Sequence, residues 1–253
     1  MEIVNAILTG QEEIAPGLRV AEFDAPKLAD EAEPGQFVHV RVGDLPLRRP
    51  FSVYRAHEGR IALLYRVKGE GTALMASWRP GRTISLVGPL GRGFAPPAPG
   101  ERVVLVGGGI GVAPLAFFGD RHPAAGAAIL GFRTGQEVCA ADRLSAAGYE
   151  VVVTTEDGTI GSQGRVTGPL ARILDGPEPV VDRVLTCGPW PMMAAVAEMA
   201  RRRGIRCEAA LEREMACGIG VCLGCVVPTG DPARPYLRVC TDGPVVPAEA
   251  VAW

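Results

Sequence analysis

The sequence lacks the features that mark several large classes of protein. It has no apolar run of 18 residues, so no membrane-spanning helix is expected. Residues Met1–Asn5 carry neither the basic nor the apolar region of a signal peptide. The net charge is −2 over 253 residues, without a long run of one sign, and nothing indicates nucleic-acid binding. Only three histidines occur, at scattered positions, so no catalytic constellation of histidines is expected.

Cysteine is the residue type that the sequence does supply, with seven in all. Four of them follow the spacing C-x4-C-x2-C-x14-C, namely Cys217, Cys222, Cys225 and Cys240. The first three fall within so short a loop that their thiols must converge. The glycines between them permit positive φ and a close backbone approach. This spacing is typical of a 2Fe-2S cluster held by four thiolates.

Two other interpretations of these cysteines remain open. A structural zinc site is one, although such sites prefer two closely spaced C-x2-C pairs. A set of buried or disulfide-bonded cysteines is the other. Seven cysteines, four of them assigned to a cluster, fit a reducing compartment better than a disulfide scaffold. We therefore expect a cytoplasmic location. Cys139 and Cys207 lie outside the motif and are expected to be structural.

The first third of the chain is predicted to form an antiparallel barrel. Pro-Gly pairs at 16–17, 34–35 and 80–81 separate short apolar runs. Many short strands at this spacing favour a closed or nearly closed barrel, here interrupted by one helix, Thr72–Trp78. The expected strands are Ile3–Leu8, Leu18–Phe23, Phe37–Val42, Phe51–Tyr54, Ile61–Arg66 and Thr83–Val87.

Two stretches of this barrel carry candidate ligand-binding residues. The first lies at the start of a predicted strand and consists of Arg49, Pro50, Phe51 and Ser52. The second, at 65–72, runs from a strand through a glycine-rich turn into the helix, and a helix N-terminus attracts anions. Taken alone, the first stretch is an ordinary edge strand and the second a simple N-terminal cap.

Together the two stretches resemble the flavin domain of the ferredoxin–NADP reductase superfamily, in which an R-x-Y/F-S/T strand and a later G-x-S/T helix start bind FAD. The resemblance implies that Arg49 faces the FAD phosphates and that Ser52 has a catalytic place at the flavin N5 edge. It implies that Gly71 and Thr72 meet the pyrophosphate. The other wall of the groove would come from 64–67, that is, from Leu64, Tyr65, Arg66 and Val67. Phe51 replaces the commoner tyrosine and keeps a flat apolar surface.

The middle third changes its periodicity. After a proline-rich linker at 93–100, an apolar strand at 102–106 leads into a glycine turn and a helix with proline in its first turn. Alternating strands and helices predict a doubly wound parallel α/β domain, in which ligands bind at the carboxyl ends of the strands. The other expected strands are Ala127–Phe132, Glu150–Thr154 and Arg183–Thr186, and the expected helices are Val112–Phe118, Ala140–Ala147, Val166–Leu174 and Pro191–Arg203.

Two strand ends in this domain are candidate nucleotide-binding sites. The glycine turn is not G-x-G-x-x-G, so a tight turn without a ligand remains open. However, G-G-G-x-G-x-x-P and C-G-P resemble the NAD(P)-binding half of the same superfamily. The resemblance implies that NAD meets Gly107, Gly108, Gly109, Gly111, Gly188 and Pro189. It places Cys187 near the nicotinamide, with a catalytic role. The sequence does not choose between NADH and NADPH, although Arg133 could meet a 2′-phosphate.

The last third carries the most specific resemblance. The runs M-A-C-G-I-G-V-C-L-G-C-V at 215–226 and V-C-T-D-G-P-V at 239–245 resemble the electron-transfer subunits of class 1B dihydroorotate dehydrogenases. The resemblance covers nearly the whole chain and implies FAD, a 2Fe-2S cluster and NAD as cofactors. It implies a catalytic partner subunit that carries FMN and oxidises dihydroorotate to orotate in pyrimidine synthesis, in a heterotetramer of two plus two. Electrons would pass from that FMN through the cluster and FAD to NAD+.

The sequence thus predicts a FAD-binding β-barrel at 1–95, an NAD-binding α/β domain at 101–206 and a 2Fe-2S module at 207–253. So small a module is expected to depend on its metal for stability. Ile219, Val221 and Leu223 should be exposed on its loop, where a partner would cover them. Two alternatives remain: the small subunit of a related iron–sulfur flavoprotein (an NADPH–ferredoxin transhydrogenase, sulfide dehydrogenase or hydrogenase gamma subunit), and a non-catalytic zinc-binding assembly module.

Overall fold

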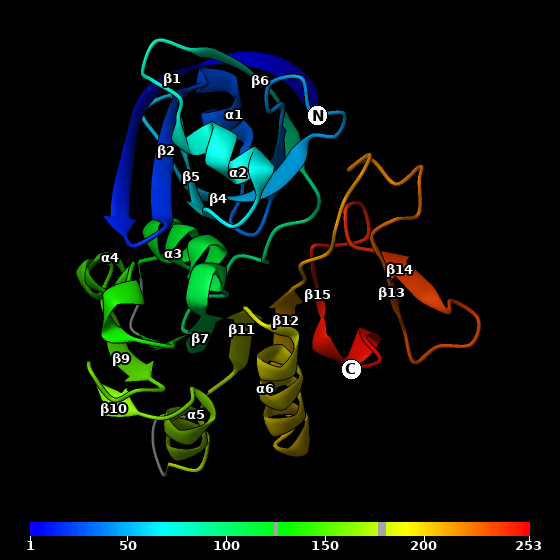
Figure 1. Cartoon of the computed structure of the whole chain (residues 1–253). Coiled ribbons are helices and arrows are strands. Elements are labelled where there is room, and N and C mark those ends of the chain that lie inside the picture. The colour runs from blue at the N-terminus through cyan, green and yellow to red at the C-terminus, as the bar shows by residue number, and fades with distance from the viewer. Residues whose placement is uncertain (124–125, 177–180) are drawn as a thin grey trace.

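The computed structural model describes residues 1–123, 126–176 and 181–253 (Figure 1). Its first part is a closed antiparallel barrel in the strand order β1-β2-β5-β4-β3-β6. Two short helices accompany the barrel, α1 (Pro26–Glu31) and α2 (Glu70–Ala76). The strands are β1 (Glu2–Ala15), β2 (Leu18–Asp24), β3 (Phe37–Val40), β4 (Arg49–His57), β5 (Arg60–Arg66) and β6 (Thr83–Leu90). The predicted barrel is therefore confirmed.

The second part is a doubly wound α/β domain, also as predicted. Its sheet has the order β10-β9-β8-β7-β11-β12-β15, and the first six of these strands run parallel. They are β7 (Val103–Gly108), β8 (Gly126–Phe132), β9 (Tyr149–Thr155), β10 (Ser162–Gln163), β11 (Arg183–Cys187) and β12 (Arg206–Ala210). The helices are α3 (Val112–Arg121), α4 (Ala141–Ala146), α5 (Thr167–Leu174) and α6 (Trp190–Arg202), with single 3-10 turns η1 (Gly109–Gly111) and η2 (Gly135–Glu137).

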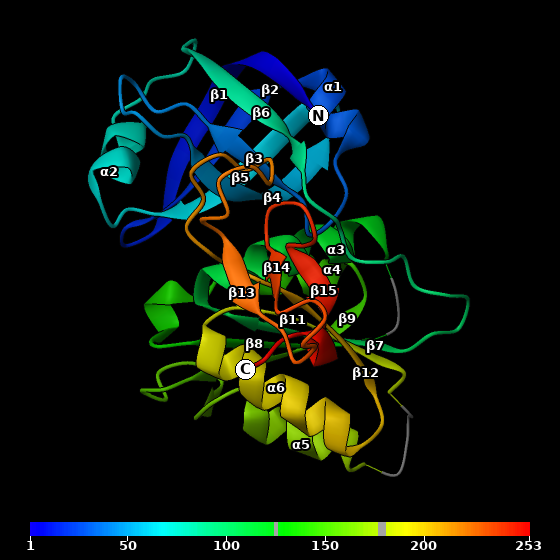
Figure 2. The ribbon, with the colours of Figure 1, turned by 90° about the vertical axis from the view of Figure 1, so that its right-hand side faces the viewer.

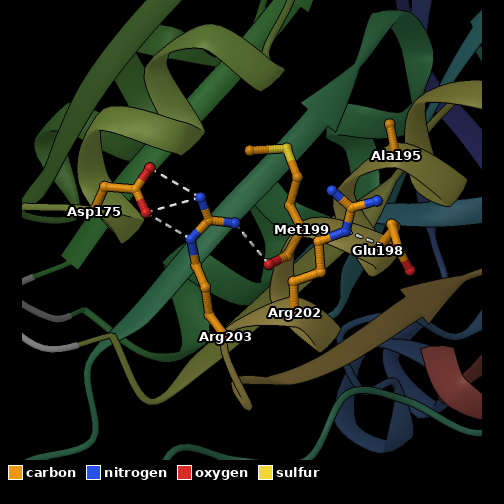
Figure 3. A pocket seen from close by; sticks show the side chains of 6 residues that line it. All are labelled: Asp175, Ala195, Glu198, Met199, Arg202 and Arg203. Carbon is orange, nitrogen blue, oxygen red and sulfur yellow. Dashed lines mark hydrogen bonds and ion pairs between the residues drawn. The ribbon is translucent and has the colours of Figure 1, made fainter.

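The helices cover the sheet on both faces. Leu115 of α3 and Leu144 of α4 belong to one buried cluster, and Leu170 of α5 and Met193 of α6 belong to another. Helices α5 and α6 lie beside each other. Arg203, just after α6, donates to both carboxylate oxygens of Asp175, at 2.8 and 2.9 Å, beside a shallow hollow on this outer face (Figure 3).

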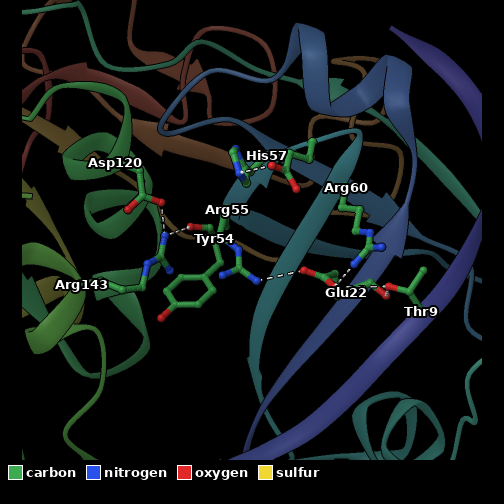
Figure 4. Close-up of polar contacts among 9 residues, drawn as sticks. Thr9, Glu22, Tyr54, Arg55, His57, Arg60, Asp120 and Arg143 are labelled. Atoms are coloured by element: carbon green, nitrogen blue, oxygen red, sulfur yellow. Dashed lines mark hydrogen bonds and ion pairs between the residues drawn. The ribbon is translucent and has the colours of Figure 1, made fainter. Parts of the chain in front are cut away.

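The barrel and the α/β domain are joined by a polar contact. Arg143 at α4 stacks on the Tyr54 ring of β4 with its guanidinium carbon 4.1 Å from the ring centroid, and it donates to the Tyr54 carbonyl at 3.3 Å (Figure 4). Asp120 of α3 accepts from the same guanidinium. Arg143 is half-buried, and its charge is offset by these partners from both domains.

The C-terminal part packs against both the α/β sheet and the barrel. It contains a hairpin, β13 (Val226–Pro228) with β14 (Tyr236–Arg238), then β15 (Val245–Pro247) and η3 (Ala248–Ala250). Strand β15 pairs antiparallel with β12, and the hairpin shares its buried cluster with α6 and with Phe37 of the barrel. Figure 2 shows the hairpin lying against the side of the molecule, close to β15.

These pairings bear on the predicted boundary at residue 206. The sheet continues past it through β12, and β15 returns to the same sheet from the far end of the chain. The module is therefore stabilised in part by apolar packing on the sheet rather than by a metal alone. We propose that its own limits start after β12, near residue 211.

Candidate functional site

The four motif cysteines come together in two pairs. The N–H of Cys222 donates to the sulfur of Cys217 at 3.4 Å, and the N–H of Cys240 donates to the sulfur of Cys225 at 3.4 Å. Hairpin β13–β14 explains how the long gap closes, since Cys225 directly precedes β13 and the Val239 N–H bonds to its carbonyl at 3.1 Å. Cys225 and Cys240 are buried, whereas Cys222 is exposed.

The loop stabilises negative charge on sulfur. Burial opposes the ionisation of Cys217, but backbone N–H groups of Ile219, Cys222 and Val221 point at its sulfur and lower its pKa to about 6. Burial and the neighbouring Cys225 raise the pKa of Cys240 to about 11. Because thiolates are the metal-binding form of cysteine, a cation at this place is needed to hold all four sulfurs ionised.

The arrangement fits a binuclear cluster better than one metal ion. Backbone hydrogen bonds to sulfur join Cys222 with Cys217 and Cys240 with Cys225, so the four cysteines form two pairs. A zinc site needs four ligands around one point, while a 2Fe-2S cluster takes two thiolates at each iron. Two buried polar atoms beside the loop, His39 Nε2 and Thr241 Oγ1, lack a partner among the described residues, as expected beside a group with further acceptors.

The apolar residues of this loop lie at the surface. The exposed fractions of Ile219, Val221 and Leu223 are 44%, 76% and 47%. The prediction that they are exposed is confirmed. The three residues stand at alternate positions of the loop that contains Cys217, Cys222 and Cys225.

The predicted flavin residues lie on β4 and at the start of α2. A Cβ built on Gly71 would come within 3.2 Å of the Arg49 Nε, so the guanidinium sits over the first turn of α2. Thr72 caps the helix: its hydroxyl accepts from the N–H groups of Lys68 and Gly69, at 3.0 and 3.2 Å. Pro50, Phe51 and Ser52 follow Arg49 along β4 and are half-buried. The assignment of these residues to a flavin site stays a prediction.

The second predicted wall of the flavin groove is mostly packed inside. Leu64 and Tyr65 are 2% and 0% exposed, and the Tyr65 hydroxyl donates to Gln11 at 2.6 Å. Both residues also pair with β2, Leu64 opposite Val20 and Tyr65 opposite Arg19. Val67 is half-buried, and Arg66 reaches the nucleotide domain, where it pairs with Glu137 at 3.3 Å.

A cavity of about 630 Å³ opens at the carboxyl ends of β7, β8, β9 and β11. The predicted Gly108, Gly109, Gly111, Gly188 and Pro189 line it, and so does Arg133. The position agrees with the rule that doubly wound sheets bind ligands at this edge. Three other lining residues were not predicted from the sequence: Thr154 near the end of β9, Arg165 after β10 and Glu212 after β12.

Gly107 and Cys187 directly precede two glycines, Gly108 and Gly188, that line this cavity. A Cβ on Gly107 would come within 2.9 Å of the Val112 side chain, so this glycine allows the turn to pack on α3. Cys187 is 2% exposed, and burial raises the pKa of its thiol well above the ordinary value. Its carbonyl oxygen would lie 2.5 Å from a Cβ on Gly111.

The barrel, the crevice of the α/β domain and the four-cysteine loop define an iron–sulfur flavoprotein of the ferredoxin reductase class. A solved structure described as an NADH-dependent reduced ferredoxin–NADP oxidoreductase is similar over 99% of this chain and 90% of its own, with a TM-score of 0.88 and 28% identity. A ferredoxin reductase of carbazole 1,9a-dioxygenase shares the fold over 81% of this chain and 66% of its own, with a TM-score of 0.69 and 20% identity.

Sequence relatives define the family more closely. Residues 212–252 match the iron-sulfur cluster binding domain of dihydroorotate dehydrogenase B. The electron transfer subunit of dihydroorotate dehydrogenase B (NAD(+)) from Desulforamulus reducens is 38% identical over 249 residues, covering 95% of this chain and 94% of that protein. The corresponding subunit from Bacillus caldolyticus is 42% identical over 231 residues, 87% of this chain and 86% of its own. The chain belongs to the family of dihydroorotate dehydrogenase B electron transfer subunits.

Proposed function

We propose that this chain carries electrons from a dihydroorotate-oxidising partner to NAD+. The main support for the proposal is that one chain holds both a four-cysteine site with an exposed loop and a strand-end cavity, and that its sequence matches a family member over 95% of its length. FAD, a 2Fe-2S cluster and NAD are its cofactors. It acts as an oxidoreductase subunit, in pyrimidine biosynthesis.

The three cofactors divide the electron chemistry. A nicotinamide exchanges two electrons at once, a 2Fe-2S cluster one at a time, and a flavin does both. The chain contributes position and charge. Cys217, Cys222, Cys225 and Cys240 would hold the cluster, Arg49 and the first turn of α2 would hold FAD phosphates, and the glycine turn at 107–111 would admit NAD. Ser52 at the flavin edge and Cys187 beneath the nicotinamide are the residues we assign to the hydride-transfer site.

The partner we propose is an FMN-containing catalytic subunit, joined in a heterotetramer of two plus two. The exposed Ile219, Val221 and Leu223 support a docking surface at the cluster loop, because burial of such residues is what an obligate interface supplies. We also propose a cytoplasmic location. All seven cysteines are free thiols, which suits a reducing compartment.

Co-expression with the catalytic subunit tests the function. We expect the two chains to co-purify with a native mass of two plus two, and the complex to reduce NAD+ with dihydroorotate only when both chains are present. A complex that turns over dye but never NAD+ would contradict the proposal. Colourless protein containing zinc would instead support an assembly module.

A second candidate is a related iron–sulfur flavoprotein. It is favoured by the similarity over 99% of the chain to a reduced ferredoxin–NADP oxidoreductase. The same preparation separates the two. Electron exchange with reduced ferredoxin and NADP+, together with indifference to dihydroorotate, would support this second function.

A further inference from the structure

A buried histidine from the barrel lies against the cysteine loop. His39 is on β3, where it is 1% exposed and pairs in register with Pro50 of the predicted flavin strand. A Cβ built on Gly218 would stand 2.6 Å from its Cε1, 2.9 Å from its Nδ1 and 3.0 Å from its Nε2. The ring edge that carries both nitrogens therefore faces the loop between Cys217 and Cys222. Figure 2 shows this part of the chain, between β12 and β13, running up to the barrel.

The ring has hydrogen-bonding capacity that the described residues do not use. Its Nε2 is buried without a partner within that part of the chain, and native proteins seldom leave such atoms unpaired. Gly218 has φ +70 and no side chain, so nothing separates the ring from the loop backbone. A second unpaired atom, Thr241 Oγ1, lies 3.1 Å from the Cβ position of Gly220 on the same loop.

The ring is neutral under ordinary conditions. Burial, with a smaller contribution from Arg48, lowers the pKa of His39 to about 4. A neutral imidazole keeps one N–H to donate. Sulfur atoms of an iron–sulfur cluster are acceptors, and hydrogen bonds to them raise the reduction potential.

We propose that His39 donates a hydrogen bond from the barrel to sulfur of the cluster held by the loop, and thereby raises the reduction potential of that cluster. The inference rests on the proposed presence of the 2Fe-2S cluster. His39 acts as a positioning residue that ties β3, the neighbour of the flavin strand, to the cluster loop. It moves no proton in the reaction.

The reduction potential and the EPR spectrum of the assembled complex test this role. His39→Phe keeps a flat ring but removes the N–H, His39→Gln restores a donor, and the exposed His57→Phe is the matched control. We expect His39→Phe to keep its iron, sulfide and FAD while the one-electron reduction equilibrium of the cluster shifts about tenfold against the reduced form, or ~59 mV. His39→Gln should recover part of the shift, and His57→Phe should show none.

A second measurement uses the wild-type protein and therefore does not require that any variant folds. Wild-type complex labelled with ¹⁵N-histidine should show an imidazole nitrogen coupled to the reduced cluster in pulsed EPR. Absence of that coupling, or an unchanged potential in a cluster-loaded His39→Phe complex, would overturn the role of His39 and leave the relay intact. Failure of the proposed function would look different, because no cluster signal or no NAD-linked activity would appear in the wild type.

Discussion

Substitution of Gly218 by alanine should weaken the cluster loop in a predictable way. The residue has φ +70, in the left-handed region that glycine adopts without strain. An alanine there costs about 1–2 kcal/mol from its backbone conformation alone. Its Cβ would also stand 2.6 Å from Cε1 of His39, which is fully enclosed in the barrel wall and cannot swing away.

The close contact adds a second contribution. Forcing an extra methyl group into a packed region costs about 1–3 kcal/mol. We therefore expect Gly218→Ala to lower the free energy of unfolding by roughly 2–5 kcal/mol, a large fraction of the 5–15 kcal/mol typical of a folded domain. Gly204 is the matched control. It has φ +65 and open space around its Cβ position, so Gly204→Ala should cost only about 1–2 kcal/mol.

Anaerobic urea unfolding of the loaded protein measures both variants. Loss of visible cluster absorbance and loss of far-ultraviolet dichroism should occur at lower urea in Gly218→Ala than in Gly204→Ala. Iron and sulfide per chain should also fall in the first variant alone. If the two variants unfold together with full cluster content, the close approach of His39 to the loop is wrong.

Three further predictions address other parts of the chain. Cys222→Ser should abolish NAD-linked orotate formation while the dye-linked activity of the partner survives; a wild-type rate of NAD+ reduction would contradict the relay. Gly111→Ala places a Cβ 2.5 Å from the Cys187 carbonyl and should displace the glycine turn. We expect the KM for NAD+ to rise about tenfold or more, with cluster content unchanged. An unaltered KM would show that NAD+ does not bind at this turn. Burial lowers the pKa of His122 below its ordinary 6.5, so the folded state binds fewer protons and stability is lost as pH falls below 6.5. His122→Gln should reduce, but not remove, the stability difference between pH 6 and pH 8 in urea unfolding, because His39 keeps its own contribution; a difference equal to that of the wild type would contradict the prediction.

Much of the architecture follows from local sequence patterns. The barrel strands were predictable because turn signals separate short apolar runs, and the parallel domain because strands alternate with helices. Helix α1 escaped prediction, since six residues with only Leu28 and Ala29 buried leave no periodic pattern. Strand β15 was not predicted either, because a run of three residues that ends in Pro247 is too short to indicate a strand. It is recognised only through its pairing with β12.

At the site, too, the sequence indicates local motifs but not contacts between distant segments. Thiol spacing alone indicated the four cysteines, because a short loop forces the first three together and the fourth follows at the gap typical of the motif. His39 gave no such signal, because its neighbour Gly218 is distant in the sequence and only the meeting of barrel and loop joins them. Leu64 and Tyr65 were assigned to a groove wall by resemblance, and the structure packs both side chains inside.

Anaerobic addition of NADH to the purified chain, loaded with FAD and iron, tests directly whether electrons pass between NAD, FAD and the cluster on this one chain. We expect the flavin absorbance to bleach and the EPR signal of a reduced 2Fe-2S cluster then to appear in the same protein. Bleaching of the flavin with an iron-loaded loop that stays silent in EPR, or a loop that contains zinc in place of iron, would contradict it.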